Sequence, residues 1–132
     1  MNISVVIPAR NAGLTIRRAL DSILISEEVS EIIVVNDGSS DGTGRVVKSY
    51  SDSRIRMIDG PSRGIAAAVN AGFNECSEDF ISRCDADDWI EAGRFSWQLD
   101  AFQRMPELVA VSAGFSSASP DGAHIADLSL DG

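Results

Sequence analysis

The chain has 132 residues, about one domain, and its hydrophobic fraction of 44% is enough to build one core. It carries 20 acidic residues against 11 lysines and arginines, a formal net charge of -9. Broad nucleic-acid binding requires a basic face, so this charge argues against nucleic acid as a partner. An anionic ligand is still allowed, because a bound metal ion reverses the local field.

No apolar run approaches the roughly 18 residues that cross a bilayer, so we expect no membrane span in this chain. The two cysteines, Cys76 and Cys84, do not make a disulfide framework, which favours a reducing compartment. We therefore expect a cytoplasmic protein, held at the inner face of a membrane if residues outside this sequence anchor it.

Short runs rich in β-branched residues predict the strands. Residues 3–7 are apolar at nearly every position, as in a strand buried on both faces, and Pro8 should end that strand. Further strands are expected at residues 32–35, 55–58, 80–84 and 108–111.

Helical periodicity separates these strands. The apolar stripe at i, i+3, i+4, i+7 and i+8 from Ile16 to Leu24 predicts an amphipathic helix. Other helices are expected at residues 41–50 with Asp41 as N-cap, at residues 65–73, and from residue 95 to a stop at Pro106. The alternation predicts an α/β fold with a mostly parallel sheet and helices on both faces.

The pattern changes after Gly114. Residues 116–119 are consistent with a strand or loop that enters a turn at residues 120–122, and residues 126–132 show no clear period.

Four polar segments follow the first four expected strands, at residues 8–11, 36–41, 60–64 and 85–88. In open parallel sheets, ligands bind beyond the carboxyl ends of the strands, so these segments should meet along one edge. The last of them holds Asp85, Asp87 and Asp88, whose crowded carboxylates would repel one another unless a cation neutralised them. Carboxylate oxygen is the ligand that hard divalent metals prefer, and we expect a metal there.

Two other segments carry weaker signals. Asp37 exceeds what a turn needs and can accept a hydrogen bond from a base or a ribose, whereas Arg63 precedes a helix N-terminus that attracts anions. No stretch matches the phosphate-loop or dinucleotide-binding glycine patterns, which disfavours an NTPase or a nicotinamide enzyme.

Four motifs in order resemble family 2 glycosyltransferases of the GT-A fold. They are V-V-I-P-A-R-N at residues 5–11, V-V-N-D-G-S-S-D-G-T at 34–43, the stretch from R-G at 63–64 to N-A-G at 70–72, and D-A-D-D at 85–88. The resemblance implies an inverting transferase that moves a sugar from a nucleotide-diphosphate donor, typically a UDP-sugar, to a carbohydrate, lipid or protein acceptor, as in polysaccharide biosynthesis.

The resemblance also implies roles for single residues. Pro8, Ala9 and Asn11 would line the nucleotide pocket, Asp37 would hold the base, and Arg63 would lie near the diphosphate. Asp85 would reach the ribose or the metal shell, Asp87 would coordinate Mg²⁺ or Mn²⁺, and Asp88 would contact the metal shell or the donor sugar.

The same resemblance places the general base beyond Gly132. We therefore expect one GT-A domain or its N-terminal portion, with a core at residues 1–114 and the start of an acceptor side at 115–132. Such a portion would expose apolar surface and can self-associate into a homo-oligomer.

Two alternatives stay open at this stage. A nucleotidyltransferase of similar fold would carry a Gly-rich, basic stretch after its first strand, and residues 9–13 are a poor version of one. A non-catalytic nucleotide-binding or assembly module would have little use for three crowded carboxylates.

Overall fold

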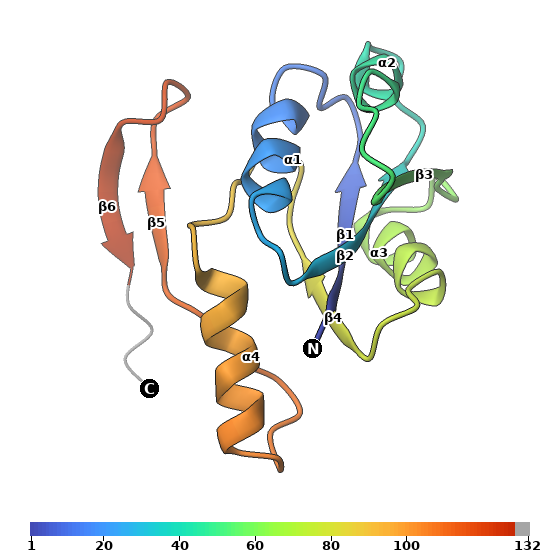
Figure 1. Cartoon of the computed structure of the whole chain (residues 1–132). Coiled ribbons are helices and arrows are strands. Elements are labelled where there is room, and N and C mark those ends of the chain that lie inside the picture. Colours follow the sequence, from blue (N-terminus) through green and yellow to red (C-terminus); the bar gives the residue numbers. More distant parts are fainter. Residues whose placement is uncertain (129–132) are drawn as a thin grey trace. The chain divides into compact units, whose positions relative to one another are not determined.

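A computed structural model of the chain describes residues 1–128. They form two compact units that divide after Phe95. The first unit holds a four-stranded sheet with three helices, and the second holds a two-stranded sheet and most of a further helix (Figure 1). Each helix within residues 1–128 is too short or too polar to cross a bilayer.

The sheet of the first unit is entirely parallel, with the order β3-β2-β1-β4. Its strands are β1 (Ile3–Ala9), β2 (Val29–Asn36), β3 (Ile55–Asp59) and β4 (Phe80–Arg83), and its helices are α1 (Ile16–Leu24), α2 (Thr43–Lys48) and α3 (Ile65–Asn74). The predicted parallel α/β architecture is confirmed. The strands at residues 32–35, 55–58 and 80–84 were each predicted in the correct place, within a few residues at their ends.

Helices cover both faces of this sheet. The stripe predicted for α1 is buried except at Leu24, which is only partly covered, and α1 contacts α2. Figure 1 shows α3 on the opposite side of the strands. There Ala68 packs in a buried cluster with Val6, Ile33 and Val35 from β1 and β2.

Gly72 lets α3 approach the sheet closely. A Cβ at this position would overlap Val6 Cγ1 and would lie 3.0 Å from Val35 Cγ2. Two residues of the predicted α3 stripe face outward instead, since Ile65 is 57% exposed and Phe73 is 38% exposed. The period was correct, but the glycine rather than Phe73 meets the strands.

The prediction that Pro8 ends the first strand is wrong. β1 continues to Ala9, and Pro8 stands in register with Val35 of β2. In a strand, alternate residues direct their backbone groups to opposite neighbours. The carbonyl of Ala9 accepts the N–H of Asp37 on the β2 side, and the carbonyl of Val6 accepts the N–H of Cys84 on the β4 side. Pro8 therefore lacks its N–H only toward β4, whose pairing with β1 ends at Val6.

The second unit differs more from its prediction. It contains the end of α4 (Arg94–Arg104) and an antiparallel pair, β5 (Phe115–Ala118) and β6 (His124–Leu128). The strand or loop expected at residues 116–119 is confirmed as β5, but β6 was not predicted. The strand expected at residues 108–111 is absent, and Val109 is 97% exposed; an apolar run alone does not supply the neighbouring strand that a ladder needs.

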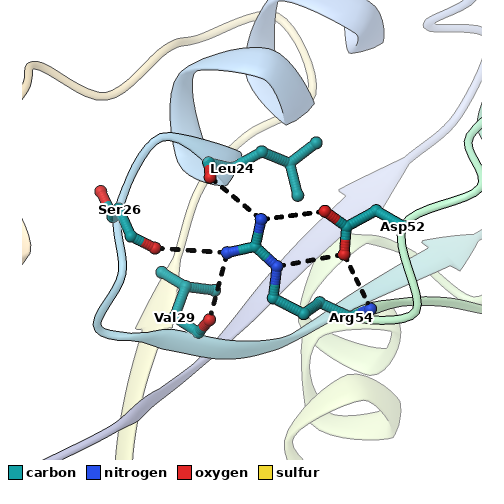
Figure 2. Close-up of polar contacts among 5 residues, drawn as sticks. All are labelled: Leu24, Ser26, Val29, Asp52 and Arg54. Carbon is teal, nitrogen blue, oxygen red and sulfur yellow. Dashed lines mark hydrogen bonds and ion pairs between the residues drawn. The ribbon is translucent and has the colours of Figure 1, made fainter.

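Arg54, just before β3, donates hydrogen bonds to backbone carbonyls at and after the C-terminus of α1 (Figure 2). Its guanidinium donates to the carbonyl oxygens of Leu24 (3.0 Å), Ser26 (3.3 Å) and Val29 (3.4 Å). Asp52 accepts two further bonds at 3.0 and 2.9 Å and so orients the fork. The last carbonyls of a helix have no partner within the helix, and here a side chain from a neighbouring segment supplies it.

We expect Arg54→Met to lower the free energy of unfolding by about 2 kcal/mol, because it removes the guanidinium hydrogen bonds to these carbonyls. Urea unfolding measures the change. Arg56→Met is the control, since Arg56 pairs with Glu75 at a site where both side chains are 47% exposed, and its change should stay within about 0.5 kcal/mol. Equal effects of the two substitutions would contradict the role of Arg54.

The effect should also depend on pH. The hydrogen bonds from the Arg54 side chain lower the pKa of Asp52 to about 2, below its ordinary value. A carboxyl whose pKa is lower in the folded state stabilises the fold above its unfolded pKa, about 3.9, and loses that contribution as the pH falls through about 2. The difference between wild type and Arg54→Met should therefore be constant above about pH 5 and shrink toward pH 2.

Candidate functional site

The four polar segments follow the carboxyl ends of the parallel strands, as predicted. Strand order places the loop after β1 between the loops that follow β2 and β4, with the loop after β3 next to that of β2. Hydrogen bonds connect the loop after β2 to the loop after β1 and to the loop after β3.

Asn11 joins the loop after β1 to the loop after β2. It has a left-handed backbone conformation with φ 50°, and its side-chain Oδ1 accepts the N–H of Ser40 at 2.8 Å. Its own N–H donates to Ser39 Oγ at 3.0 Å. The side-chain oxygen of Asn11 is therefore engaged in holding two loops together.

Asp41 makes a second connection between the same loops. One carboxylate oxygen accepts the N–H of Gly13 at 3.0 Å, and the other accepts both the N–H and the hydroxyl of Thr43. These bonds, the Thr43 hydroxyl first, lower the pKa of Asp41. The predicted N-cap is wrong by one residue, because Gly42 is the N-cap of α2 and Asp41 precedes it.

Asp37 is buried, with 5% of its surface exposed, and it links three loops. Its Oδ1 accepts the N–H of Ser62 at 2.7 Å, and its own N–H donates to the carbonyl of Ala9 at 2.8 Å. A Cβ at Gly60 would overlap Asp37 Oδ1, so the close approach requires glycine there. Oδ2 of Asp37 accepts no hydrogen bond from residues 1–128 and is available to a ligand.

The remaining predicted nucleotide residues differ in exposure. Pro8 and Ala9 are buried at the end of β1, whereas Arg63 is exposed. Arg63 stands one residue before Gly64, the N-cap of α3, where no side chain caps the helix. The first amides of α3 are thus left for another acceptor, and an anion suits that position.

The loop after β4 carries the acidic cluster. Asp85 is partly buried, Asp87 and Asp88 are exposed, and one carboxylate oxygen of each lies within 4.8 Å of those of the other two. Ala86 and Ile90, each 6% exposed, anchor the loop in the core. The apolar residues therefore turn inward and present the three carboxylates together.

The proximity of the three carboxylates affects the pKa values of groups in this loop. Burial raises the pKa of Asp88, the charges of Asp87 and Asp85 raise it further, and Arg83 and Arg94 act in the opposite direction. Burial, followed by the charges of Asp88 and Asp85, raises the pKa of the neighbouring Cys84 thiol to about 12. A cation placed among these groups would be stabilised.

Two residues of α1 contact the segment that directly follows the acidic cluster. Arg18 stacks on the ring of Trp89, with 4.7 Å between the guanidinium carbon and the ring centroid. The N–H of Ile90 donates to Ser22 Oγ at 3.0 Å. The residues after Asp88 are thus fixed to a helix whose own stripe is buried.

The donor set fits a hard divalent cation. Three carboxylates converge, each with one oxygen within 4.8 Å of an oxygen of the other two, and Mg²⁺ or Mn²⁺ takes oxygen ligands of this kind.

Sequence reasoning missed two residues of this edge. Arg83 Nε donates to Asp85 Oδ1 at 2.9 Å, Arg83 Nη2 forms an ion pair with the same oxygen at 2.9 Å, and the Ser62 N–H donates to Asp37. The spacing i, i+2 at the end of an extended strand was a usable signal for Arg83, because such residues share a side. Nothing in the sequence pairs Ser62 with Asp37.

Known proteins are similar to this chain in sequence. Residues 4–127 match the family Glycosyl transferase family 2. The chain is 34% identical over 128 residues to a chondroitin synthase of Pasteurella multocida, which covers 95% of this chain and 13% of that enzyme.

Solved structures agree in fold. Staphylococcus aureus TarS 1-349 in complex with UDP-GlcNAc superposes with a TM-score of 0.71 at 22% identity, covering 79% of this chain and 32% of the other. Glucosyl-3-phosphoglycerate synthase of Mycobacterium tuberculosis, in complex with Mn²⁺, UDP and phosphoglyceric acid, superposes with a TM-score of 0.64 at 28% identity. That match covers 80% of this chain and 40% of the synthase.

The parallel sheet, the acidic loop after β4 and the family match over residues 4–127 lead to one conclusion. This chain belongs to glycosyl transferase family 2 and has the GT-A fold.

Proposed function

We propose that this chain binds the donor for an inverting, metal-dependent transfer of sugar from a nucleotide-diphosphate sugar, a UDP-sugar, to an acceptor hydroxyl. The Mycobacterium tuberculosis relative, crystallised with Mn²⁺ and UDP, supports both the metal and the nucleotide. The complex of TarS with UDP-GlcNAc supports a donor of the same chemical class.

The observation that carries this proposal is the convergence of Asp85, Asp87 and Asp88 at the carboxyl end of β4. A bound divalent ion would act there as a Lewis acid on the diphosphate and stabilise the charge that grows on the leaving group. Asp87 and Asp85 would hold the ion, and Asp88, beside them, would contact the donor sugar.

The buried Asp37 suits recognition of the base. Its Oδ1 is fixed by Ser62, so its Oδ2 has a defined direction and can accept the N–H of a uracil ring. Pro8 and Ala9 would form the floor of the nucleotide site at the end of β1, and Asn11 would shape its wall through its bonds to the next loop. Arg63 and the amides of α3 would lie on the side of the diphosphate.

Inversion follows if the acceptor hydroxyl attacks the anomeric carbon from the face opposite the diphosphate. The carbon–oxygen bond to the nucleoside diphosphate breaks as the new bond forms, and the hydroxyl proton passes to a general base, a carboxylate. We assign no residue of this chain to that base. Residues 1–114 would serve the donor, and residues 115–132 would begin the acceptor side.

A cytoplasmic location is part of the same proposal. Both Cys76 and Cys84 are free thiols, which a reducing compartment maintains. The acceptor would be a carbohydrate, a lipid or a protein.

Calorimetric titration with UDP, GDP and TDP, each with and without Mn²⁺, tests the function. We expect one diphosphate, UDP, to bind at least about tenfold more tightly with Mn²⁺, because an ion held by these carboxylates would attract the diphosphate. Metal-dependent binding of a nucleoside triphosphate together with a sugar phosphate would indicate a nucleotidyltransferase instead. The absence of binding by every nucleotide would contradict the proposal.

A further inference from the structure

Arg83 is the last residue of β4 and pairs with one member of the acidic cluster. Its Nε and Nη2 both lie 2.9 Å from Oδ1 of Asp85, so the guanidinium fork grips a single oxygen. The other oxygen of Asp85 is left for a different partner. The two side chains are 43% and 40% exposed, so a ligand can approach the pair from solvent.

The guanidinium of Arg83 lies beside the carboxylates that would bind a cation. The ligand oxygens of Asp85, Asp87 and Asp88 gather within 4.8 Å of one another, and Arg83 already neutralises part of their charge. A divalent ion that binds these oxygens meets a fixed positive charge a few ångströms away. It must either displace the fork from Asp85 or bind beside it, and both reduce its affinity.

A diphosphate changes this balance. Its negative charges attract the guanidinium and the metal together, so repulsion between the two cations is offset when nucleotide and metal are both present. The same arginine therefore opposes the ion alone and favours the ion with its anion. This is a coupling between two ligands, and it must be reciprocal.

We propose that Arg83 is a positioning residue that acts through Asp85: it substitutes for the metal in the ligand-free site and makes cation binding depend on the nucleotide diphosphate. This inference rests on the proposed function, because it presumes a divalent ion at Asp85 and Asp87.

A purely structural explanation of the ion pair predicts otherwise. Exposed ion pairs contribute little to stability, and the Arg56–Glu75 pair shows the same local chemistry, 2.8 Å long with both side chains 47% exposed, away from the acidic loop. If Arg83 were another such pair, its replacement would leave coupling between metal and nucleotide unchanged. The Arg56–Glu75 pair thus provides a matched control.

The test uses Arg83→Gln, Arg83→Lys and Arg56→Gln in the full chain. Free and bound Mn²⁺ are measured by electron paramagnetic resonance without nucleotide, and UDP is then titrated at saturating Mn²⁺. We expect Arg83→Gln to bind Mn²⁺ alone about tenfold more tightly, because the substitution removes a unit positive charge beside the carboxylates that would hold the divalent ion. UDP should bind Arg83→Gln at least about tenfold more weakly at saturating Mn²⁺, the effect of losing one charge-assisted contact.

The Lys variant separates charge from geometry. Because lysine keeps the positive charge, Arg83→Lys should bind Mn²⁺ alone within about threefold of wild type, and Arg56→Gln should match wild type in both titrations. Thermal melts confirm that each variant is folded before it is compared.

Each remaining outcome has a defined meaning. Unchanged or weaker Mn²⁺ binding by folded Arg83→Gln, while wild type binds Mn²⁺, overturns the role of Arg83 and leaves the proposed metal site standing. An Arg83→Lys variant that behaves like Arg83→Gln overturns the charge argument. Failure of wild type to bind Mn²⁺ with or without UDP overturns both the inference and the proposed function.

Discussion

Asp87→Ala should abolish the Mn²⁺-dependent part of nucleotide affinity. Asp87 is exposed, and its ligand oxygen lies within 4.8 Å of those of Asp85 and Asp88, so its removal deletes one of three converging ligands. Loss of an outer-shell partner alone weakens metal binding about 10–100-fold, and loss of a ligand should exceed about a hundredfold. Calorimetry of UDP with and without Mn²⁺ measures the effect.

The same strand supplies a control for this substitution. Asp79 is an exposed aspartate that directly precedes β4, at the opposite end from the acidic loop, so Asp79→Ala removes an equal charge away from the site. Metal-dependent affinity should survive in that variant. If Asp87→Ala kept wild-type affinity for Mn²⁺ and UDP together, Asp87 would not be a ligand.

Replacement of Asp37 should weaken nucleotide binding even without metal. Its carboxylate is 5% exposed, one oxygen is held by Ser62, and the other is available to a base. A hydrogen bond to a charged group is worth about 1.5–3 kcal/mol, so Asp37→Ala should lower UDP affinity roughly 10–100-fold. Calorimetry without Mn²⁺ isolates this loss from the metal.

Asp37→Asn separates recognition from loop geometry. The asparagine oxygen can still accept the Ser62 N–H, but its amide then presents a donor where the uracil N–H needs an acceptor. We expect Asp37→Asn to lose UDP affinity like Asp37→Ala while it keeps the thermal stability of wild type. Unchanged UDP affinity in both variants would return Asp37 to a turn role, and pyrophosphate with Mn²⁺ should bind all three proteins equally.

Much of the first unit could be predicted because its signals are local. β1 and β2 are buried on both faces, and runs of β-branched residues identify such strands without knowledge of their neighbours. Once the strands alternate with helices, chain order places the polar segments at one edge. The acidic cluster was therefore found from spacing alone, and its three oxygens do converge.

The errors arose where the outcome depends on a distant partner. Pro8 stays in β1 because β4 stops pairing at Val6, and the sequence near Pro8 does not contain that information. Residues 108–111 have strand composition but no strand beside them among the described residues.

The fine structure of the site was hidden for the same reason. The sequence does not show that the side-chain oxygen of Asn11 accepts the N–H of Ser40, 29 positions along the chain. Asp37 meets Ser62 across 25 positions. The residue type indicates that such a side chain forms hydrogen bonds. Which donor it accepts from depends on how the loops pack in the folded protein.

Gly72 has an effect beyond the contact that it makes. Because no side chain separates it from Val6 and Val35, α3 comes close to the strands at this point. A Gly72→Ala substitution would push this part of α3 away from the sheet. Because a helix moves as a rigid unit, its first residue, Ile65, two turns away, would shift as well. Gly72, which lies at the other end of α3 from its N-terminus, would thus influence the distance between the first amides of α3 and a phosphate bound there.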